Sequence, residues 1–511
     1  MKLNKIAVAG MMLAAGSSFA ATAPLACVKT SPEQFVNTCA PAATFFVAGS
    51  SALGGAISTV ISASSVTGAK GYFDTSVVPF VVSVVDTGTA NGISVINATN
   101  GGKAGQGVSA WYGMSRADLT GGTSVPILVV YNSYMGSAAG VSNVLANPKS
   151  LASGVPEADV VTVGPVAGKA NTCALVTAPL AIAGVTSTTV AAATNKVACS
   201  SHAVTQADLA ISDVNVNELV GMYDVLKGGT ALSKATMVPL AMQGFAVAVN
   251  NNFYNALQNY QISTGALPAT CTGLYTEACQ PSISRAQYAS LVTKQGNIKS
   301  AAGFIPGSTE VLTLARRDQL SGTQATSNIY FASEVCNVLD AKSKVNTHGG
   351  ALTAMRATDA TAYAPSLVVH ENVQTGDVET DLKATTGYSI GLIALSKGNS
   401  TSYKFVKLDG ASPNFAKGGS AVLASTALRN NMIDGSWGLQ MTAYAVYRTA
   451  DGTYGPKALK ANMIKQMVAD LSDSTLHDLS AIGYFNGTAA KQTKVSRVAG
   501  NNCSPLITRT N

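Results

Sequence analysis

Residues 311–323 read VLTLARRDQLSGT. The first five form an apolar run with β-branched side chains, which is typical of a buried strand. A Ser-Gly-Thr triplet at 321–323 follows, and apolar side chains then recur at helical spacing as far as Cys336. The stretch therefore predicts a strand, a polar turn and a helix in direct succession.

The same order occurs twice earlier in the chain. Residues 45–52 read FFVAGSSA, and the apolar positions from Leu53 to Ile61 then share one helical face. Residues 127–140 read ILVVYNSYMGSAAG, and a helical pattern follows until Pro148. Strands that alternate with helices imply an α/β fold, and we expect its sheets to be mainly parallel.

Two segments between these units differ in composition. Residues 64–125 and 149–205 are rich in Ala, Val, Gly, Thr and Ser with few charges, and they predict β-rich insertions. The other predicted elements are a buried strand at 207–211 ending at Ser212-Asp213, a strand at 238–250, a helix that begins at the capping box of Ser284 and Gln287, and an amphipathic helix from Leu459 to Leu471.

Length and composition narrow the class of protein. The chain has 511 residues, and its first 20 combine two lysines, an apolar run and Ser18-Phe19-Ala20, which predicts a cleaved signal peptide and a periplasmic or secreted protein. A hydrophobic fraction of 47% excludes a disordered chain. The net charge of +7 is scattered, so no nucleic-acid partner is expected. No later apolar run reaches the ~18 residues of a spanning helix, so we expect no membrane-spanning segment.

Eight cysteines behind a signal peptide indicate disulfides formed in an oxidising compartment. Sequence leaves the pairing open, because eight cysteines allow about 105 connectivities. Our preferred pairing joins nearest neighbours and leaves Cys336 to pair with Cys503. Under that pairing the other bridges are Cys27–Cys39, Cys173–Cys199 and Cys271–Cys279. A metal site is the alternative, but the four histidines are scattered and no Cys-x-x-Cys occurs, so we expect no metal and no other cofactor.

The three turns share a chemistry suited to anions. A strand that ends in Gly and Ser and leads into a helix leaves backbone N–H groups and a partial positive charge at the helix start. Three such turns that converge could replace the hydration shell of a small oxyanion. Arg316 and Arg317 add guanidinium groups, which match oxyanion geometry. The alternatives are simple helix caps at each turn, and a surface ion pair between the arginines and Asp318.

Together these motifs resemble the phosphate-binding proteins that serve ABC transporters, which are type II periplasmic binding proteins. The resemblance follows the chain order of Gly49–Ala52, Gly136–Gly140, Ser212-Asp213 and Arg317–Thr323, and it extends to residues 387–391, 407–410 and 482–484. It implies two α/β lobes joined by crossing strands, with the ligand in the cleft. The lobes would comprise residues 21–243 with 392–511, and residues 244–391.

The resemblance also implies a set of ligand-binding residues. Ser51, the amide of Ala52, and Ser137 would contact the anion from one lobe, and Arg317, Ser321, Gly322 and Thr323 from the other. Asp213 would accept a hydrogen bond from protonated phosphate and exclude sulfate, which carries no proton at neutral pH. Whether Arg316 or Arg317 faces the cleft stays open. A membrane permease would be the partner of a monomeric binding protein.

Two other functions compete with phosphate capture. The β-rich insertions could make the protein an extracellular adhesin, matrix or assembly protein built on the same fold. A hydrolase with a serine near His202 or His477 is a third hypothesis, ranked last because the chain has no Gly-x-Ser-x-Gly motif. The sequence therefore favours a binding protein that is not an enzyme.

Overall fold

The computed structural model describes residues 41–63, 71–74, 78–84, 108–133, 136–145, 160–162, 173–175, 177–178, 180–181, 189–190, 196–199, 203–222, 235–336, 352–372, 374–398, 400–448, 457–498 and 501–509. The predicted signal peptide, Cys27, Cys39 and His202 lie outside these residues, as do the side chains of Cys173 and Cys199.

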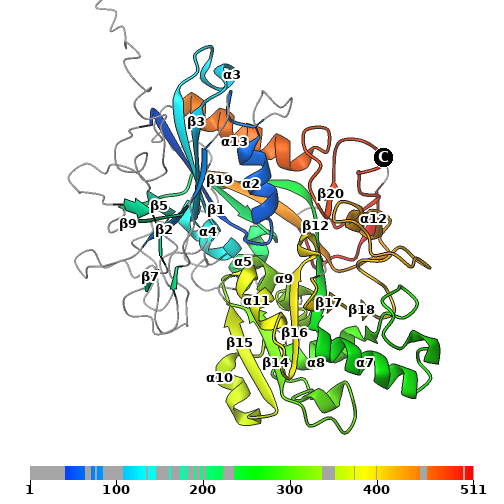
Figure 1. The fold of residues 1–511 in the computed structure, drawn as a ribbon. Helices are drawn as coiled ribbons and strands as arrows, with labels where there is room; N and C mark the ends of the chain where they lie inside the picture. The colour runs from blue at the N-terminus through cyan, green and yellow to red at the C-terminus, as the bar shows by residue number, and fades with distance from the viewer. Residues whose placement is uncertain are drawn as a thin grey trace, which may run out of the picture.

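Most of the described strands form one long mixed sheet that passes through two lobes (Figure 1), and the others form two-stranded sheets. In the first lobe, β1 (Ala43–Gly49) lies parallel to β4 (Pro126–Asn132) on one side and to β11 (Leu209–Ser212) on the other. In the second, β14 (Leu312–Arg317) lies parallel to both β15 (Leu367–Asn372) and β16 (Tyr388–Ala394). Each lobe therefore has its own parallel core.

Strand β12 (Ala235–Asn250) connects the lobes. Residues from Ala235 to Gly244 pair antiparallel with β19 (Gln440–Arg448), and residues from Phe245 to Val249 pair antiparallel with β16. At the change of partner, Trp437 donates its indole N–H to the carbonyl of Phe245 at 2.7 Å. The lobe bounds expected at residues 243 and 391 fall inside β12 and β16 and not in loops between elements. Those bounds stay a prediction.

The α/β fold in two lobes is confirmed, but the expectation of mainly parallel sheets is wrong. Among the described strands of the central sheet, the parallel pairs are β1 with β4 and β11, β14 with β15 and β16, and β2 with β9. The strands of the insertions and the crossing strands return as antiparallel neighbours. Antiparallel neighbours can follow one another through a short turn, whereas parallel neighbours need a long crossover connection.

The two predicted insertions contain strands among their described residues and extend the first-lobe sheet. From the first insertion, β2 (Val78–Val84) and β3 (Val108–Met114) continue outward from β4. From the second, β9 (Lys196–Cys199) and β6 (Cys173–Leu175) lie beyond β2. The other insertion strands are β5 (Val160–Thr162), β7 (Leu180–Ala181), β8 (Thr189–Val190) and β10 (Ala203–Thr205).

Helices cover both faces of the sheet in each lobe, which explains why the central strands are apolar throughout. On one face of the first lobe, α13 (Lys457–Ser472) packs on α2 (Gly54–Ser62) and α3 (Ala117–Thr120), while α4 (Gly136–Leu145) packs on the other face. The second lobe carries α8 (Arg285–Val292), α9 (Gly322–Ala332) and α11 (Thr375–Leu382), and α5 (Val216–Met222) follows β11 in the first.

The remaining described elements are α7 (Asn251–Ser263), α10 (Ala357–Ala360), α12 (Asn430–Ile433), η7 (Ala269–Cys271), η8 (Ala301–Gly303), η9 (Thr361–Tyr363), η10 (Leu395–Lys397), η11 (Ala427–Arg429), β13 (Ser282–Ile283), β17 (Tyr403–Phe405), β18 (Lys407–Leu408), β20 (Ile482–Tyr484), β21 (Val495–Ser496) and β22 (Ile507–Thr508).

Several local predictions are confirmed. The side chain of Ser284 accepts from the N–H of Gln287, and the Gln287 side chain accepts from the N–H of Ser284, as in a capping box. Two expected disulfides, Cys271–Cys279 and Cys336–Cys503, are present. The backbones of Cys173 and Cys199 lie directly opposite each other in neighbouring strands. Across the described residues, every helix is too short or too polar to cross a membrane.

Candidate functional site

The site lies where the carboxyl ends of β1, β4 and β11 meet. Parallel pairing places these ends at the same edge of the sheet, so the loop after β1, the start of α4 and Asp213 become neighbours. Gly49 permits this approach, because its φ is +116° and an added Cβ would overlap the backbone of Ile211. A Cβ on Gly140 of α4 would likewise come within 2.6 Å of the Gly49 nitrogen, so the helix packs directly on the loop.

Asp213 is the buried acid of the site, with 1% of its surface exposed. The hydroxyl of Ser50 donates to its Oδ1, and its own N–H donates to Ser137 Oγ at 3.0 Å. Burial raises the pKa of Asp213 to about 6, although Ser50, Arg317 and Ser137 act in the opposite direction. The carboxyl group is therefore mostly ionised at pH 7 and sits among serine hydroxyl groups.

Arg317 reaches this edge from the second lobe and is 2% exposed. Its Nη1 donates to Ser51 Oγ at 2.7 Å and to Thr375 Oγ1 at 3.0 Å, and its Nε donates to the carbonyl of Asn372 at 3.0 Å. Burial lowers the pKa of Arg317, while the charges of Asp318 and Asp213 raise it. A buried guanidinium group thus bridges the two lobes.

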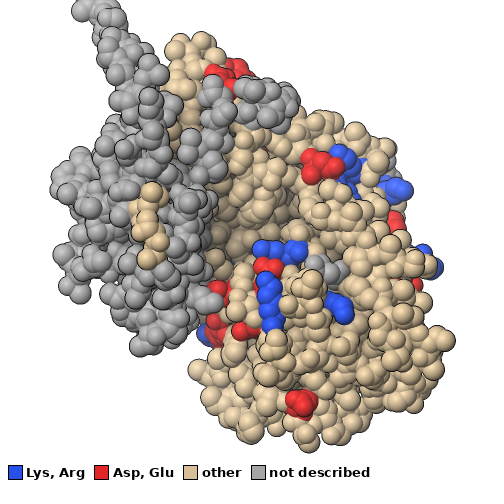
Figure 2. Space-filling model, in the orientation of Figure 1, with Lys and Arg blue, Asp and Glu red and all other residues tan. Residues whose placement is uncertain are grey.

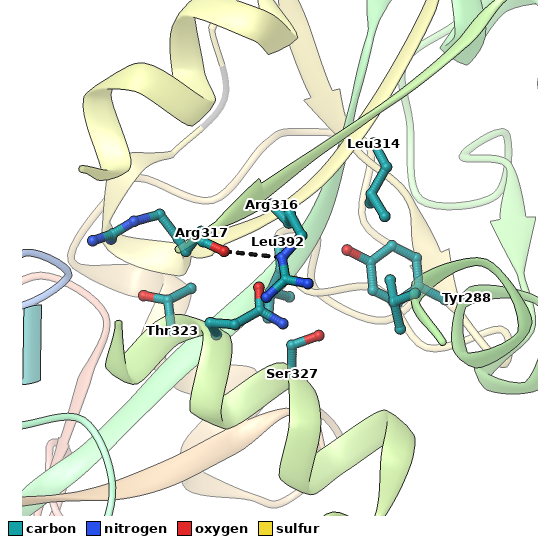
Figure 3. Close-up of a pocket in the computed structure, with 9 residues that line it drawn as sticks. Tyr288, Leu314, Arg316, Arg317, Thr323, Ser327 and Leu392 are labelled. Carbon is teal, nitrogen blue, oxygen red and sulfur yellow. Dashed lines mark hydrogen bonds between the residues drawn. The ribbon is translucent and has the colours of Figure 1, made fainter. Parts of the chain in front are cut away.

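The two adjacent arginines point to opposite sides of β14, as successive residues of a strand must. Arg316 Nε donates to the Arg317 carbonyl at 3.0 Å, and its guanidinium lies toward Tyr288 and Ser327 inside the second lobe (Figure 3). The Arg317 side chain extends the other way (Figure 3). Arg317 is therefore the arginine at the lobe boundary. Both arginines are buried, so the alternative of surface side chains paired with Asp318 is wrong.

The start of α9 closes the site from the second lobe. Ser321 caps the helix by accepting from the N–H of Gln324 at 3.4 Å. A Cβ added to Gly322 would lie within 2.8 Å of the Asp213 Cβ and overlap Ser137 Oγ. The amide of Ala138 donates to the Leu320 carbonyl at 2.9 Å, so the backbones of the two lobes are in direct contact here.

Thr323 lies behind this contact. Its Oγ1 is buried without a hydrogen-bond partner and lines a cavity with Arg316, Gln324 and Ser327. The cavity offers about 10 Å³ to the centre of a water molecule, which is room for about one water. A phosphate-sized anion therefore does not fit in this cavity.

The structure brings together most of the predicted site residues. Arg317 contacts Ser51, and Ser137, Asp213 and Gly322 contact one another, with the charge of Arg317 close enough to act on Asp213. Ser321 adjoins Gly136, and Ala52 and Thr323 are buried. The sequence reasoning missed Ser50 and Thr375. Thr375 had a signal: it follows a strand and precedes Gly376, which is the same strand, hydroxyl and glycine pattern as at the other turns.

Charges elsewhere are sparse. The described part of the face in Figure 2 is mostly uncharged, with small groups of Lys, Arg, Asp and Glu, several of them near the lobe boundary. Within the described ranges no three His, Cys, Asp or Glu side chains are placed to hold a metal ion. His477 lies beside α13, with its Nε2 3.7 Å from Asp470 Oδ2, and both groups are buried.

Comparison with known proteins gives weak matches. No protein-family model matches the chain, and no curated protein matches it. An ABC-type phosphate transport receptor from Vibrio cholerae is similar over 52% of this chain and 78% of its own, at 14% identity and a TM-score of 0.27. PstS from Borrelia burgdorferi is similar over 53% and 74%, at 13% identity and a TM-score of 0.22.

A regulatory protein matches this chain with a similar TM-score and coverage. The OxyR regulatory domain from Pseudomonas aeruginosa is similar over 51% of this chain and 72% of its own, at 7% identity and a TM-score of 0.21. With TM-scores this low, none of these likenesses assigns a ligand or an activity to the chain.

Proposed function

We propose that this protein is a solute-binding protein that captures phosphate between its lobes without turning it over. One observation carries the proposal: the buried guanidinium group of Arg317 crosses the lobe boundary to Ser51, next to the buried carboxylate of Asp213. Burying a cation and an acid costs desolvation energy that their mutual attraction does not always offset. Buried ionisable groups with shifted pKa values therefore gather at functional sites, here one suited to a charged ligand. The starts of α4 and α9 meet at the same place and favour an anion there.

The arrangement suits an oxyanion that carries a proton. Arg317, the hydroxyl groups of Ser51 and Ser137, and the amides at the helix starts would donate to its oxygen atoms. Asp213 would accept a hydrogen bond from the O–H group of monohydrogen phosphate. Sulfate has no proton at neutral pH, so it would face the carboxylate with an unpaired repulsion. Discrimination should be strong because an unmatched buried charge is costly.

Capture would require the lobes to separate and close again. Gly322 now contacts Ser137 and Asp213, which are the groups that would surround the ligand. Strand β12 connects the lobes and would bend at the point where its pairing changes from β19 to β16. In the closed complex the anion would lie between the start of α9 and Asp213.

The cellular setting of the proposal is the periplasm or the exterior of the cell. The two disulfides between described cysteines fit an oxidising compartment. Delivery of the bound anion to an ABC permease is part of the proposal. The adhesin or assembly hypothesis for the insertions stays a hypothesis, since no contact among the described residues favours it.

The test is a calorimetric titration of ligand-stripped protein with phosphate and with sulfate. We expect stoichiometric phosphate binding, little sulfate binding, and no product release from phosphate esters. Arg317→Gln removes charge-assisted hydrogen bonds of about 1.5–3 kcal/mol each, so phosphate affinity should fall at least 100-fold. The matched control is Arg316→Gln, which changes the neighbouring arginine of the same strand and should leave affinity within about threefold.

Asp213→Asn separates the two parts of the proposal. It should weaken phosphate binding and narrow the gap between phosphate and sulfate, because the repelling charge is gone. The proposal fails if wild-type protein binds no phosphate, or if Arg317→Gln binds it as tightly as Arg316→Gln does.

A further inference from the structure

Helix α11 begins at Thr375, whose hydroxyl group reaches the site. This hydroxyl belongs neither to the Gly/Ser turns of the first lobe nor to α9. Thr375 is 3% exposed. Its Oγ1 lies 3.0 Å from Arg317 Nη1 and 3.2 Å from Ser51 Oγ. A guanidinium nitrogen can only donate, so both hydroxyl oxygens accept from Arg317 and one hydroxyl donates to the other.

These contacts set the plane of the guanidinium group. Nε donates to the Asn372 carbonyl at the end of β15, and Nη1 donates to Thr375 three residues further along the same chain segment. The remaining nitrogen, Nη2, lies toward α4, where a Cβ added to Gly136 would lie 3.6 Å from it. A fixed plane matters because guanidinium recognises oxyanions through planar, paired hydrogen bonds.

We propose that Thr375 is a positioning residue that aims Arg317 at the anion-binding turns. The expected effect on phosphate affinity rests on the proposed function. The orientation of the Arg317 guanidinium group is already present in the ligand-free structure. Thr375→Val keeps the shape of the side chain and removes its hydroxyl group. It should lower phosphate affinity about tenfold, because Arg317 loses one charge-assisted partner and its fixed plane.

Matched variants isolate the positioning role. Thr375→Ser keeps the hydroxyl and should restore affinity to within about twofold. Thr380→Val changes an exposed threonine of the same helix, whose hydroxyl bonds only within α11 to Gly376, and should have no effect. Should Thr375→Val fold poorly, Thr375→Ala serves the same purpose.

A second readout does not depend on phosphate. In ligand-free protein labelled with ¹⁵N-arginine, the side-chain N–H signals of Arg317, assigned by their loss in Arg317→Lys, should shift and exchange faster with water in Thr375→Val. They should not change in Thr380→Val. The proposal is overturned if the Arg317 signals of Thr375→Val match those of wild type. It is also overturned if wild type binds phosphate and Thr375→Val binds it equally well. If wild type binds no phosphate but the signals of Thr375→Val do shift, only the proposed function is contradicted.

A separate observation concerns the other end of α9. Beyond this helix, Cys336 forms a disulfide with Cys503, 167 residues later. The neighbouring Asn502 is fixed to the first lobe: its Nδ2 donates to Glu218 Oε2 at 3.0 Å, and its Oδ1 accepts from the amide of Thr442 at 2.8 Å. The disulfide therefore links the second lobe to a tail segment that is bound on α5 and β19.

The same end of α9 also packs directly on α5. A Cβ added to Gly221 of α5 would come within 2.6 Å of Val335. Helix α9 thus contacts the first lobe at its start through Gly322, and the turn after its last residue, Ala332, contacts the first lobe through Val335 and Cys336.

We infer that the Cys336–Cys503 disulfide limits how far the lobes can separate. Without it, the tail no longer holds the end of α9, and the open state gains conformational freedom. Replacing both cysteines with serine should increase the radius of gyration of ligand-free protein in X-ray scattering and release phosphate several-fold faster. The control replaces Cys271 and Cys279, whose disulfide closes a short loop inside the second lobe.

The control pair should leave both quantities unchanged. If the Cys336 and Cys503 variant fails to fold, mild reduction and alkylation of folded protein provides the same comparison. Scattering curves that coincide for wild type and the opened disulfide overturn the inference, whether or not phosphate binds.

Discussion

Replacing Asp213 with asparagine should change the free energy of unfolding more favourably at high pH than at low pH. The native pKa of Asp213 is raised by burial to about 6, against 3.8 for a free carboxyl group. The native state therefore holds this proton more tightly than the unfolded chain does. Wild-type stability from this group is fully present below 3.8 and is lost as the pH rises through about 6.

The size of the effect follows from the shift of roughly two pKa units. At about 1.36 kcal/mol per unit, wild type should lose about 3 kcal/mol over the full pH range relative to Asp213→Asn. About 2 kcal/mol of this should appear between roughly pH 4.5 and pH 8. The hydrogen bonds that asparagine alters with Ser50 and Ser137 do not titrate, so they cancel in the difference between the two pH values.

The assay is urea unfolding at both pH values, followed by the fluorescence of Trp111 and Trp437, which are buried. The free energy of unfolding of the variant, minus that of wild type, should be more positive at pH 8 than at pH 4.5. A difference that does not change with pH, or that grows toward acid, would refute the claim that Asp213 is a buried, ionised acid in the ligand-free protein. It would also remove the basis for its role in selectivity.

Three further predictions test the packing of the site and of the strands behind it. Gly322→Ala should abolish phosphate binding in calorimetry, because the new methyl group meets Ser137, whereas Gly376→Ala, which meets nothing within 4 Å, should bind normally. Asn250→Ala should lower the free energy of unfolding by about 2–4 kcal/mol, because its buried side chain makes four hydrogen bonds to backbone groups; a loss below about 1 kcal/mol would contradict this. Gln243→Met should raise the melting temperature, since both polar atoms of this buried amide lack partners, and a lower melting temperature would count against the reasoning.

Much of the local structure could be predicted from sequence because it depends on nearby residues. The capping box at Ser284 needs only a hydroxyl group and an amide three positions apart. The strand before Arg317 and the helix of residues 457–472 follow from apolar periodicity. The order of turns along the chain was visible for the same reason.

The choice between Arg316 and Arg317 shows where such reasoning stops. Adjacent residues of a strand point to opposite faces, and periodicity cannot say which face meets the other lobe. The structure decides it, because β14 lies between β15 and β16 and presents Arg317 to Ser51. Thr375 was missed for a related reason, since its neighbours are 58 and 324 residues away in the chain.

Sequence alone determined the strand, turn and helix units and the hydroxyl and glycine residues that end them, because hydrogen bonding within a turn and the burial of one helical face act over short distances. Only the tertiary structure decided the mixed sheet, the arginine at the lobe boundary and the contacts of Asp213. Those features depend on which strand edges pair and which faces pack across long separations in the chain, where many alternatives satisfy the local pattern equally well.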